Sequence, residues 1–247
     1  MINERWPHSS VPASGAYRLT GNVAALAFNF MGGFSYTGAE RLPGRAQPYI
    51  LAPTHRSMLD IPALGLAMLE AADREVHFLA KQELFKPGLI GSFLSACGAF
   101  PVDRDEKGPK MKVPLEHLQN VLRDRGVVGI FPEGTRKNGQ EVSRFDLYDG
   151  VAWLAMKEQA AIVPVGIAGT EKGKTGPAHV AFGETITPLD IAELDSTLPY
   201  VKHRKAIRSS IMDVVYNGMQ TAFDEANQAR TKAVNEFSAS PPQAITI

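Results

Sequence analysis

The stretch PYILAPTHRSMLD at residues 48–60 predicts a buried strand that leads directly into a helix. The apolar run is short and stops at Pro53, as expected for a strand that is buried on both faces. From Leu59 onward apolar residues recur at helical spacing, which places Asp60 near the first turn of a helix. His55 and Asp60 therefore lie at a strand-to-helix junction, where α/β folds hold their functional groups.

The same alternation of strand and helix patterns continues along the chain. Pro164 suggests that its strand is an edge strand or begins there, because proline has no N–H for the ladder. The order favours an α/β fold, a single domain with a mostly parallel sheet flanked by helices. Further strands are predicted at residues 76–80, 99–102, 126–131, 162–167 and 179–182, and further helices at 85–95, 113–125, 150–159 and 199–237.

Composition divides the chain into a main domain at 41–237, an amino-terminal apolar segment at 1–40 and a frayed tail at 238–247. Within the amino-terminal segment, residues 19–39 carry no charge but include polar residues and glycines, so they are less apolar than a membrane-spanning helix. They suit either a helix in the headgroup region of a membrane or a core helix of a soluble protein. The apolar stretch 84–94 leaves the same two alternatives open.

Length, charge and cysteine content exclude several classes of protein. With 247 residues, 44% of them hydrophobic, the chain can bury a sizeable core. Its net charge of zero lacks the electrostatic footprint of a nucleic-acid-binding protein. The single Cys97 excludes an internal disulfide, and the scattered histidines, with His77 in an apolar strand, predict no metal site. The start of the chain lacks the features of a signal peptide, so we expect a cytoplasmic protein.

The pair His55 and Asp60 suggests proton transfer from a hydroxyl group. A histidine titrates near neutral pH, and a nearby carboxylate can fix its tautomer and stabilise the imidazolium form. The sequence contains no serine or cysteine elbow of the G-x-S-x-G kind. The hydroxyl that is activated can therefore belong to a substrate.

A second stretch, FPEGTR at residues 131–136, follows another predicted buried strand. The proline ends the strand, and the loop that follows can present Glu133 and Arg136 into a cleft. Together the two stretches resemble the signature of the glycerolipid acyltransferase family, which pairs H-x-x-x-x-D with F-P-E-G-[TS]-R. Three further segments are similar to blocks of that family: KQEL at 81–84, GAFPVDR at 98–104 and VPV at 163–165.

The resemblance covers roughly residues 48–185 and includes two departures. The family commonly has asparagine before the histidine, where this chain has Thr54, which can still donate and accept a hydrogen bond. The family also often has a basic residue before the glycine that matches Gly150, where this chain has Asp149. The second departure puts an anion-binding role for that position in doubt.

The resemblance implies transfer of a fatty acyl group from a thioester of coenzyme A or acyl-carrier protein to a hydroxyl of a glycerol phosphate, with no further cofactor. His55 would act as the general base and Asp60 would orient its ring. Arg136 and Arg104 would bind the phosphate of the acceptor, since a guanidinium can grip phosphate oxygens with two hydrogen bonds. Glu133 would hold an acceptor hydroxyl or fix Arg136, and its loop neighbours Gly134 and Thr135 would also belong to the substrate-binding site.

Alternatives remain at several positions. Glu133 and Arg136 could simply pair on a surface loop, and Lys81 is either a solvated cation or a contact for the phosphates of the donor. The expected acceptor is 1-acylglycerol 3-phosphate, giving phosphatidic acid, with glycerol 3-phosphate itself as the alternative. A third possibility is a catalytically inactive, membrane-bound binding protein. Lipid substrates favour a peripheral or monotopic protein at the cytoplasmic face of a membrane, with no nucleic acid as partner.

Overall fold

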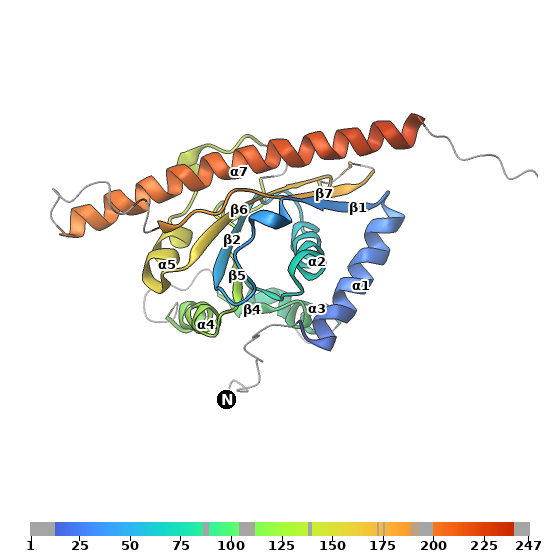
Figure 1. Ribbon diagram of the computed structural model, residues 1–247. Helices are drawn as coiled ribbons and strands as arrows, with labels where there is room; N and C mark the ends of the chain where they lie inside the picture. The colour runs from blue at the N-terminus through green and yellow to red at the C-terminus, as the bar shows by residue number, and fades with distance from the viewer. Residues whose placement is uncertain are drawn as a thin grey trace, which may run out of the picture.

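A computed structural model describes residues 13–85, 89–103, 112–137, 140–171, 173–174, 176–188, 191 and 200–239. Seven strands form one sheet in the order β1-β7-β6-β2-β5-β3-β4 (Figure 1). All neighbours are parallel except β6 and β7, which confirms the predicted mostly parallel sheet. The strands are β1 (Phe34–Thr37), β2 (Tyr49–Pro53), β3 (Val76–Lys81), β4 (Ala99–Val102), β5 (Val127–Gly129), β6 (Ala161–Ala168) and β7 (Ala178–Phe182).

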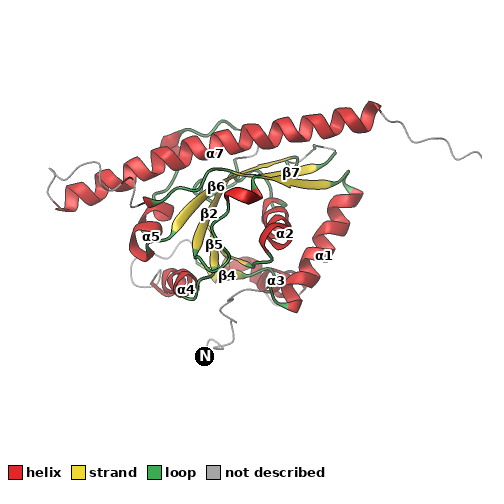
Figure 2. Cartoon of the chain, in the orientation of Figure 1, coloured by secondary structure: helices red, strands yellow, loops and turns green. Residues whose placement is uncertain are grey.

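Helices cover both faces of the sheet, as Figure 2 shows. One face packs against the helices α1 and α2, and the other packs against α4, α5 and α7. In β2, Tyr49 and Leu51 point to the face that α1 and α2 cover, and Ile50 and Ala52 point to the face that α4, α5 and α7 cover. Alternate side chains of a strand point to opposite faces of its sheet. The helices are α1 (Gly15–Phe30), α2 (Asp60–Ala72), α3 (Leu89–Ala96), α4 (Lys112–Arg123), α5 (Gly150–Glu158) and α7 (Tyr200–Ala239), with single turns η1 (Ala39–Arg41), η2 (Gln82–Phe85) and η4 (Arg144–Asp146).

The strand that contains Pro164 is central, so the edge-strand prediction was wrong. β6 lies between β2 and β7, and the carbonyl of Pro164 accepts a hydrogen bond from the N–H of Gly183. The ladder between β6 and β7 pairs Val165 with Phe182, and the next bridge pairs Ile162 with Ile186. Between these two pairs, the segment that follows β7 has one residue more than β6. Pro164 therefore faces a bulge, where the ladder does not need the N–H that proline lacks.

The amino-terminal segment is not one continuous apolar helix. α1 ends at Phe30, and residues 34–37 form the edge strand β1, which pairs in parallel with β7. Glycines 32 and 33 have φ angles of 115° and 113°, a conformation that favours glycine and lets the chain turn from helix to strand. Within the described part of the chain, no helix is both long and apolar enough to cross a membrane.

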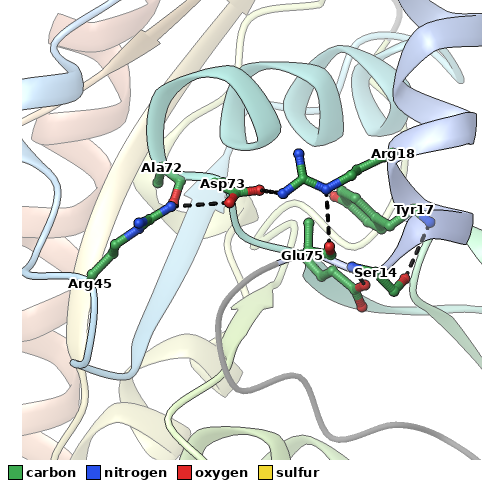
Figure 3. A network of polar contacts seen from close by, with 8 residues as sticks. Ser14, Tyr17, Arg18, Arg45, Ala72, Asp73 and Glu75 are labelled. Atoms are coloured by element: carbon green, nitrogen blue, oxygen red, sulfur yellow. Dashed lines mark hydrogen bonds and ion pairs between the residues drawn. The ribbon is translucent and has the colours of Figure 1, made fainter.

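The start of α1 is tied to the end of α2 by the polar contacts that Figure 3 shows. Asp73, in a left-handed conformation after α2, binds the guanidinium groups of Arg18 and Arg45. The N–H of Ser14 donates to Glu75 Oε1 at 2.7 Å, and the buried hydroxyl of Tyr17 accepts from the N–H of Val76 at 3.2 Å. Burial raises the pKa of Tyr17, so its hydroxyl stays protonated. These contacts fix the orientation of α1 on the sheet.

Other element boundaries differ from the predictions by a few residues. The helix predicted at 85–95 starts at Leu89, after the single turn η2. The long carboxy-terminal helix runs through Ala239, so the tail predicted to fray from 238 begins as helix, and its remaining residues lie outside the described part. His77 is 3% exposed, as predicted for a core histidine, and Cys97 is half-buried.

Candidate active site

Three neighbouring strands in the centre of the sheet end at one place. β2 leads to His55, β5 leads to the 131–136 loop, and β6 leads to Thr170. Because these strands are parallel, their carboxyl ends lie on the same edge of the sheet. The two stretches that the sequence singled out are brought together there.

The ring of His55 is held by Asp60, as the sequence predicted. His55 Nδ1 lies 3.0 Å from Asp60 Oδ2, the carboxylate is fully buried and the His55 side chain is 12% exposed. Asp60 Oδ2 also accepts hydrogen bonds from the backbone N–H groups of Arg56 and Ser57, both at 2.7 Å. The buried carboxylate of Asp60 is thus satisfied by several hydrogen-bond donors, which offset the cost of its burial.

The backbone of His55 is fixed by the 131–136 loop. Its N–H donates to Glu133 Oε1 at 3.0 Å, and its carbonyl accepts from the N–H of Lys137 at 2.9 Å. Its ring stacks on Phe131, with ring centroids 4.1 Å apart. Both the ring and the main chain of His55 therefore have fixed positions.

Glu133 is turned into the protein, not toward Arg136. It is 2% exposed, and its Oε2 has no hydrogen-bond partner among the described residues. Burial raises the pKa of Glu133, and the hydrogen bond from the His55 N–H and the nearby charge of Arg56 oppose that shift. The surface pairing of Glu133 with Arg136 that the sequence left open is not what the structure shows.

The remainder of the loop is more open. Gly134 has a φ angle of 66°, and a Cβ atom there would lie 2.6 Å from the Tyr148 ring, so both conformation and space favour glycine. The N–H of Thr135 donates to the carbonyl of Glu133 at 2.7 Å. Thr135 and Arg136 are exposed, which leaves the Arg136 guanidinium accessible to a soluble phosphate group.

The two other predicted binding residues are Lys81 and Arg104. Lys81, at the end of β3, forms an ion pair of 2.9 Å with Glu83, and both side chains are about half exposed. Arg104 lies outside the described residues. Asp149, the departure from the family pattern, forms an ion pair of 3.3 Å with Arg208 on α7.

A cavity of about 950 Å³ lies beside the junction, between α7 and the loops that follow β2, β5 and β6. Its lining includes Arg56, which is 6% exposed, donates to the carbonyl of Gln140 and lies 5.0 Å from the centroid of the Phe223 ring. The wall carries charges of both signs, and it offers room for a polar part of a substrate. The charged lining residues are Arg56, Glu141, Glu171, Lys174 and Asp224.

Sequence reasoning missed Thr170 and Arg56. Thr170 is 2% exposed, and its hydroxyl donates to Asp60 Oδ1 at 2.6 Å. It follows the VPV strand just as His55 follows β2, so its place after a buried strand was a usable signal. No group of three or more His, Cys, Asp or Glu side chains in the described ranges is arranged to hold a metal ion.

Comparisons with known proteins found a family model and several relatives that match this chain. The family model described as Acyltransferase matches residues 33–168. The chain is 31% identical over 203 residues to the 1-acyl-sn-glycerol-3-phosphate acyltransferase of Bacillus subtilis (strain 168). The aligned region covers 80% of this chain and 96% of that protein. It is 28% identical over 230 residues to the enzyme of the same name from Streptococcus pneumoniae (strain ATCC BAA-255 / R6), covering 90% of this chain and 77% of that protein.

A solved structure has the same fold. The crystal structure of the 1-acyl-sn-glycerophosphate acyltransferase from Thermotoga maritima aligns with a TM-score of 0.56 and 21% sequence identity, over 81% of this chain and 78% of that one. The matched family region contains the whole His55–Asp60 junction and the 131–136 loop. The chain therefore belongs to the acyltransferase family.

Proposed function

We propose that the protein transfers a fatty acyl group from an acyl thioester to the free hydroxyl of 1-acylglycerol 3-phosphate, which gives phosphatidic acid. The observation that carries the proposal is the 3.0 Å contact between His55 Nδ1 and a fully buried Asp60, next to the 131–136 loop. The relatives named as 1-acyl-sn-glycerol-3-phosphate acyltransferases support this choice of acceptor.

The proposed mechanism uses His55 as general base and then as general acid. Because the Asp60 carboxylate accepts a hydrogen bond, the proton of the neutral ring sits on Nδ1 and Nε2 is free to accept another. Nε2 takes the proton of the acceptor hydroxyl while that oxygen attacks the thioester carbonyl. The tetrahedral oxyanion then collapses, the C–S bond breaks, and the thiolate takes the proton from Nε2 as it leaves.

The acceptor phosphate is assigned to Arg136, with Arg104 as a second candidate. Arg136 is exposed on the loop whose Glu133 holds the backbone of His55, so a phosphate bound there stays close to the general base. A guanidinium can bind two phosphate oxygens at once and so orient the acceptor. Lys81, at the same edge of the sheet as a strand end, is the candidate contact for the donor phosphates.

The exposed side of α1 supports contact with a membrane surface. Its buried residues Tyr17, Gly21, Ala24 and Phe28 are each followed two positions later by an exposed apolar residue. Two residues correspond to about 200° of rotation, so the exposed stripe lies opposite the buried one. Its members are Leu19 (65% exposed), Val23 (53%), Leu26 (59%) and Phe30 (85%), an apolar face suited to the headgroup boundary of a bilayer.

A direct assay tests the proposed reaction. The purified protein is incubated with acyl-coenzyme A or acyl-carrier protein and with either 1-acylglycerol 3-phosphate or glycerol 3-phosphate, and the products are identified by mass. We expect phosphatidic acid from the lysophospholipid, at a higher kcat/KM than any product from glycerol 3-phosphate. The reverse order would assign the protein to glycerol 3-phosphate, and no product from either would leave a binding protein.

The His55→Ala variant tests the mechanism in the same assay. We expect thiol release to fall by at least about a hundredfold, because general-base catalysis is worth that much or more. The control is His117→Gln, which removes a histidine that stacks on Phe100 from α4. A His55→Ala protein with normal activity would refute the assignment of the general base.

A further inference from the structure

We infer that Thr170 is a positioning residue for the acyl transfer, because its hydroxyl holds the Asp60 carboxylate in the orientation that His55 needs. The inference rests on the proposed function of His55 as general base. Thr170 Oγ1 donates to Asp60 Oδ1 at 2.6 Å, and both residues are buried, at 2% and 0% exposure. The family model ends at residue 168, so Thr170 lies beyond the matched region.

The two oxygens of Asp60 have different partners. Oδ2 accepts from the His55 ring and from the N–H groups of Arg56 and Ser57, all of which come from the same short stretch as Asp60 itself. Oδ1 is held by Thr170, which is 110 residues away in the chain. The local donors fix one end of the carboxylate, and the distant hydroxyl fixes its rotation about the Cβ–Cγ bond.

A hydroxyl has a single hydrogen, and at this site it goes to the carboxylate. Oδ1 is inside the protein and cannot turn to water, so without Thr170 it would have to take up a proton or rotate away. Either change weakens the acceptor that keeps the His55 proton on Nδ1. Nε2 would then no longer be reserved for the substrate hydroxyl.

The chain holds Thr170 in place by a tight turn after β6. Gly169 has a φ angle of 85°, and a Cβ atom there would lie 2.4 Å from the carbonyl oxygen of Pro177. The N–H of Gly169 donates to Glu171 Oε2 at 2.8 Å. On the other side, Thr54 Oγ1 accepts from the N–H of Ile167 at 3.1 Å, which joins the end of β6 to the residue before His55.

The test compares Thr170→Val, Thr170→Ser and the unchanged protein by steady-state kinetics across a range of pH. Valine keeps the shape and removes the hydroxyl, so we expect kcat to fall about tenfold with KM for both substrates nearly unchanged. Its pH–rate profile should differ from that of the unchanged protein, whereas the profile of the serine variant should not. Serine keeps the hydroxyl and should restore most of kcat. Thr170→Ala is measured in parallel, because it removes the hydroxyl without placing a methyl group against the carboxylate.

A second readout does not depend on the substrate. The ring nitrogens of His55 are observed by ¹⁵N NMR and assigned with a His55→Gln variant. We expect the Nδ1–H form in the unchanged protein and in Thr170→Ser, and a mixture of tautomers in Thr170→Val and Thr170→Ala.

Two results would overturn the inference: wild-type kcat and an unchanged His55 tautomer in Thr170→Val, or equal losses of kcat in the valine and serine variants. If the unchanged protein transfers no acyl group, the proposed function fails. The tautomer comparison then still decides whether Thr170 orients the His55–Asp60 pair.

Discussion

A histidine that acts as a general base must keep one ring nitrogen free while the rest of the residue is held still. In His55 the ring nitrogen Nδ1, the backbone N–H and the carbonyl all have partners, from Asp60, Glu133 and Lys137. Glu133 thus acts on the main chain of His55, a role that neither reading of the 131–136 loop had assigned. Its buried carboxylate makes this arrangement costly for stability.

Replacement of Glu133 by glutamine should make the protein more stable at neutral pH. Burial raises the folded-state pKa of this acid above its unfolded value, so the folded state binds the proton more tightly. The free energy of unfolding therefore falls as pH rises from the pKa of Glu133 in the unfolded chain to its higher pKa in the folded protein. The loss of stability remains at pH 7. Glutamine removes it and can still accept from the His55 N–H.

Thermal unfolding at pH 7 and at pH 4 checks this prediction. The Glu133→Gln protein should unfold at a higher temperature at pH 7, by roughly 2–4 °C for each kcal/mol regained, and the difference should shrink at pH 4. Glu141→Gln, on an exposed residue of the same segment, is the control. An equal gain at both pH values would show that charge burial is not the cause.

Arg136→Ala should raise the KM for the acceptor about tenfold or more and lower kcat less. A charge-assisted hydrogen bond to phosphate is worth roughly 1.5–3 kcal/mol, and Arg136 is exposed, so its loss should spare the fold. Initial rates at varied acceptor concentration measure the effect. Lys232→Ala, which removes a 79% exposed cation near the far end of α7, is the control. An unchanged acceptor KM would transfer the phosphate role to Arg104 or to another cation.

At the residue scale the sequence predicted local contacts and missed distant ones. His55 and Asp60 are five positions apart at a strand-to-helix junction, and that spacing alone made their contact a reasonable expectation. Thr170 meets Asp60 across 110 residues, through the pairing of β2 with β6. Such a contact follows from strand order, which the hydrophobic pattern of a single chain does not specify.

At the scale of elements, α1 is partly a core helix, as one alternative for the amino-terminal segment held, and its contact with a membrane stays a prediction. One face packs in the core and the opposite face is apolar and exposed. β1 was missed because its four residues follow a helix in an uncharged stretch and pair with a strand far along the chain. A strand of four residues is too short to show a clear alternation of apolar and polar residues in the sequence.

Leu26→Glu should weaken binding to vesicles of phosphatidylethanolamine and phosphatidylglycerol by about tenfold or more. Burial of a leucine side chain is worth roughly 1.5–3 kcal/mol, and the new carboxylate would be repelled by anionic lipid. Co-sedimentation with vesicles measures the change. Because Leu26 is 59% exposed, its replacement should leave the unfolding temperature unaltered.

The control is Asn29→Glu, which adds the same charge to an exposed position of α1 outside the apolar stripe. If both variants bind vesicles equally, the stripe is not the contact surface. The apolar stretch 84–94 would then be the next region to test.

At the scale of the whole molecule, α7 packs directly on the middle of the sheet. Gly166 in β6 allows this approach, since a Cβ atom there would lie 2.2 Å from the backbone of Ala222. A Cβ atom at Gly218 in α7 would likewise lie 2.6 Å from the ring of Pro164. The sequence predicted both the helix and the strand, but their close contact depends on glycines whose role no periodic pattern reveals.

Gly166→Ala should destabilise the protein by about 1–3 kcal/mol or more, because neither the strand nor the helix backbone can move aside cheaply. Denaturant unfolding gives the change in free energy. Gly15→Ala serves as the control, since a Cβ atom at Gly15 would meet nothing within 4 Å. A neutral Gly166→Ala variant would mean that α7 can shift on the sheet without loss.

The pairing of β1 with β7 also sets the order of events during synthesis. Ser35 and its partner His179 are 144 residues apart, so a ribosome has released α1 long before it makes the strand that anchors the following turn. Throughout that interval the nascent chain carries a helix with two apolar faces and only part of its final partner surface. The core face of α1 can therefore be fully covered only after β7 has been made, late in synthesis.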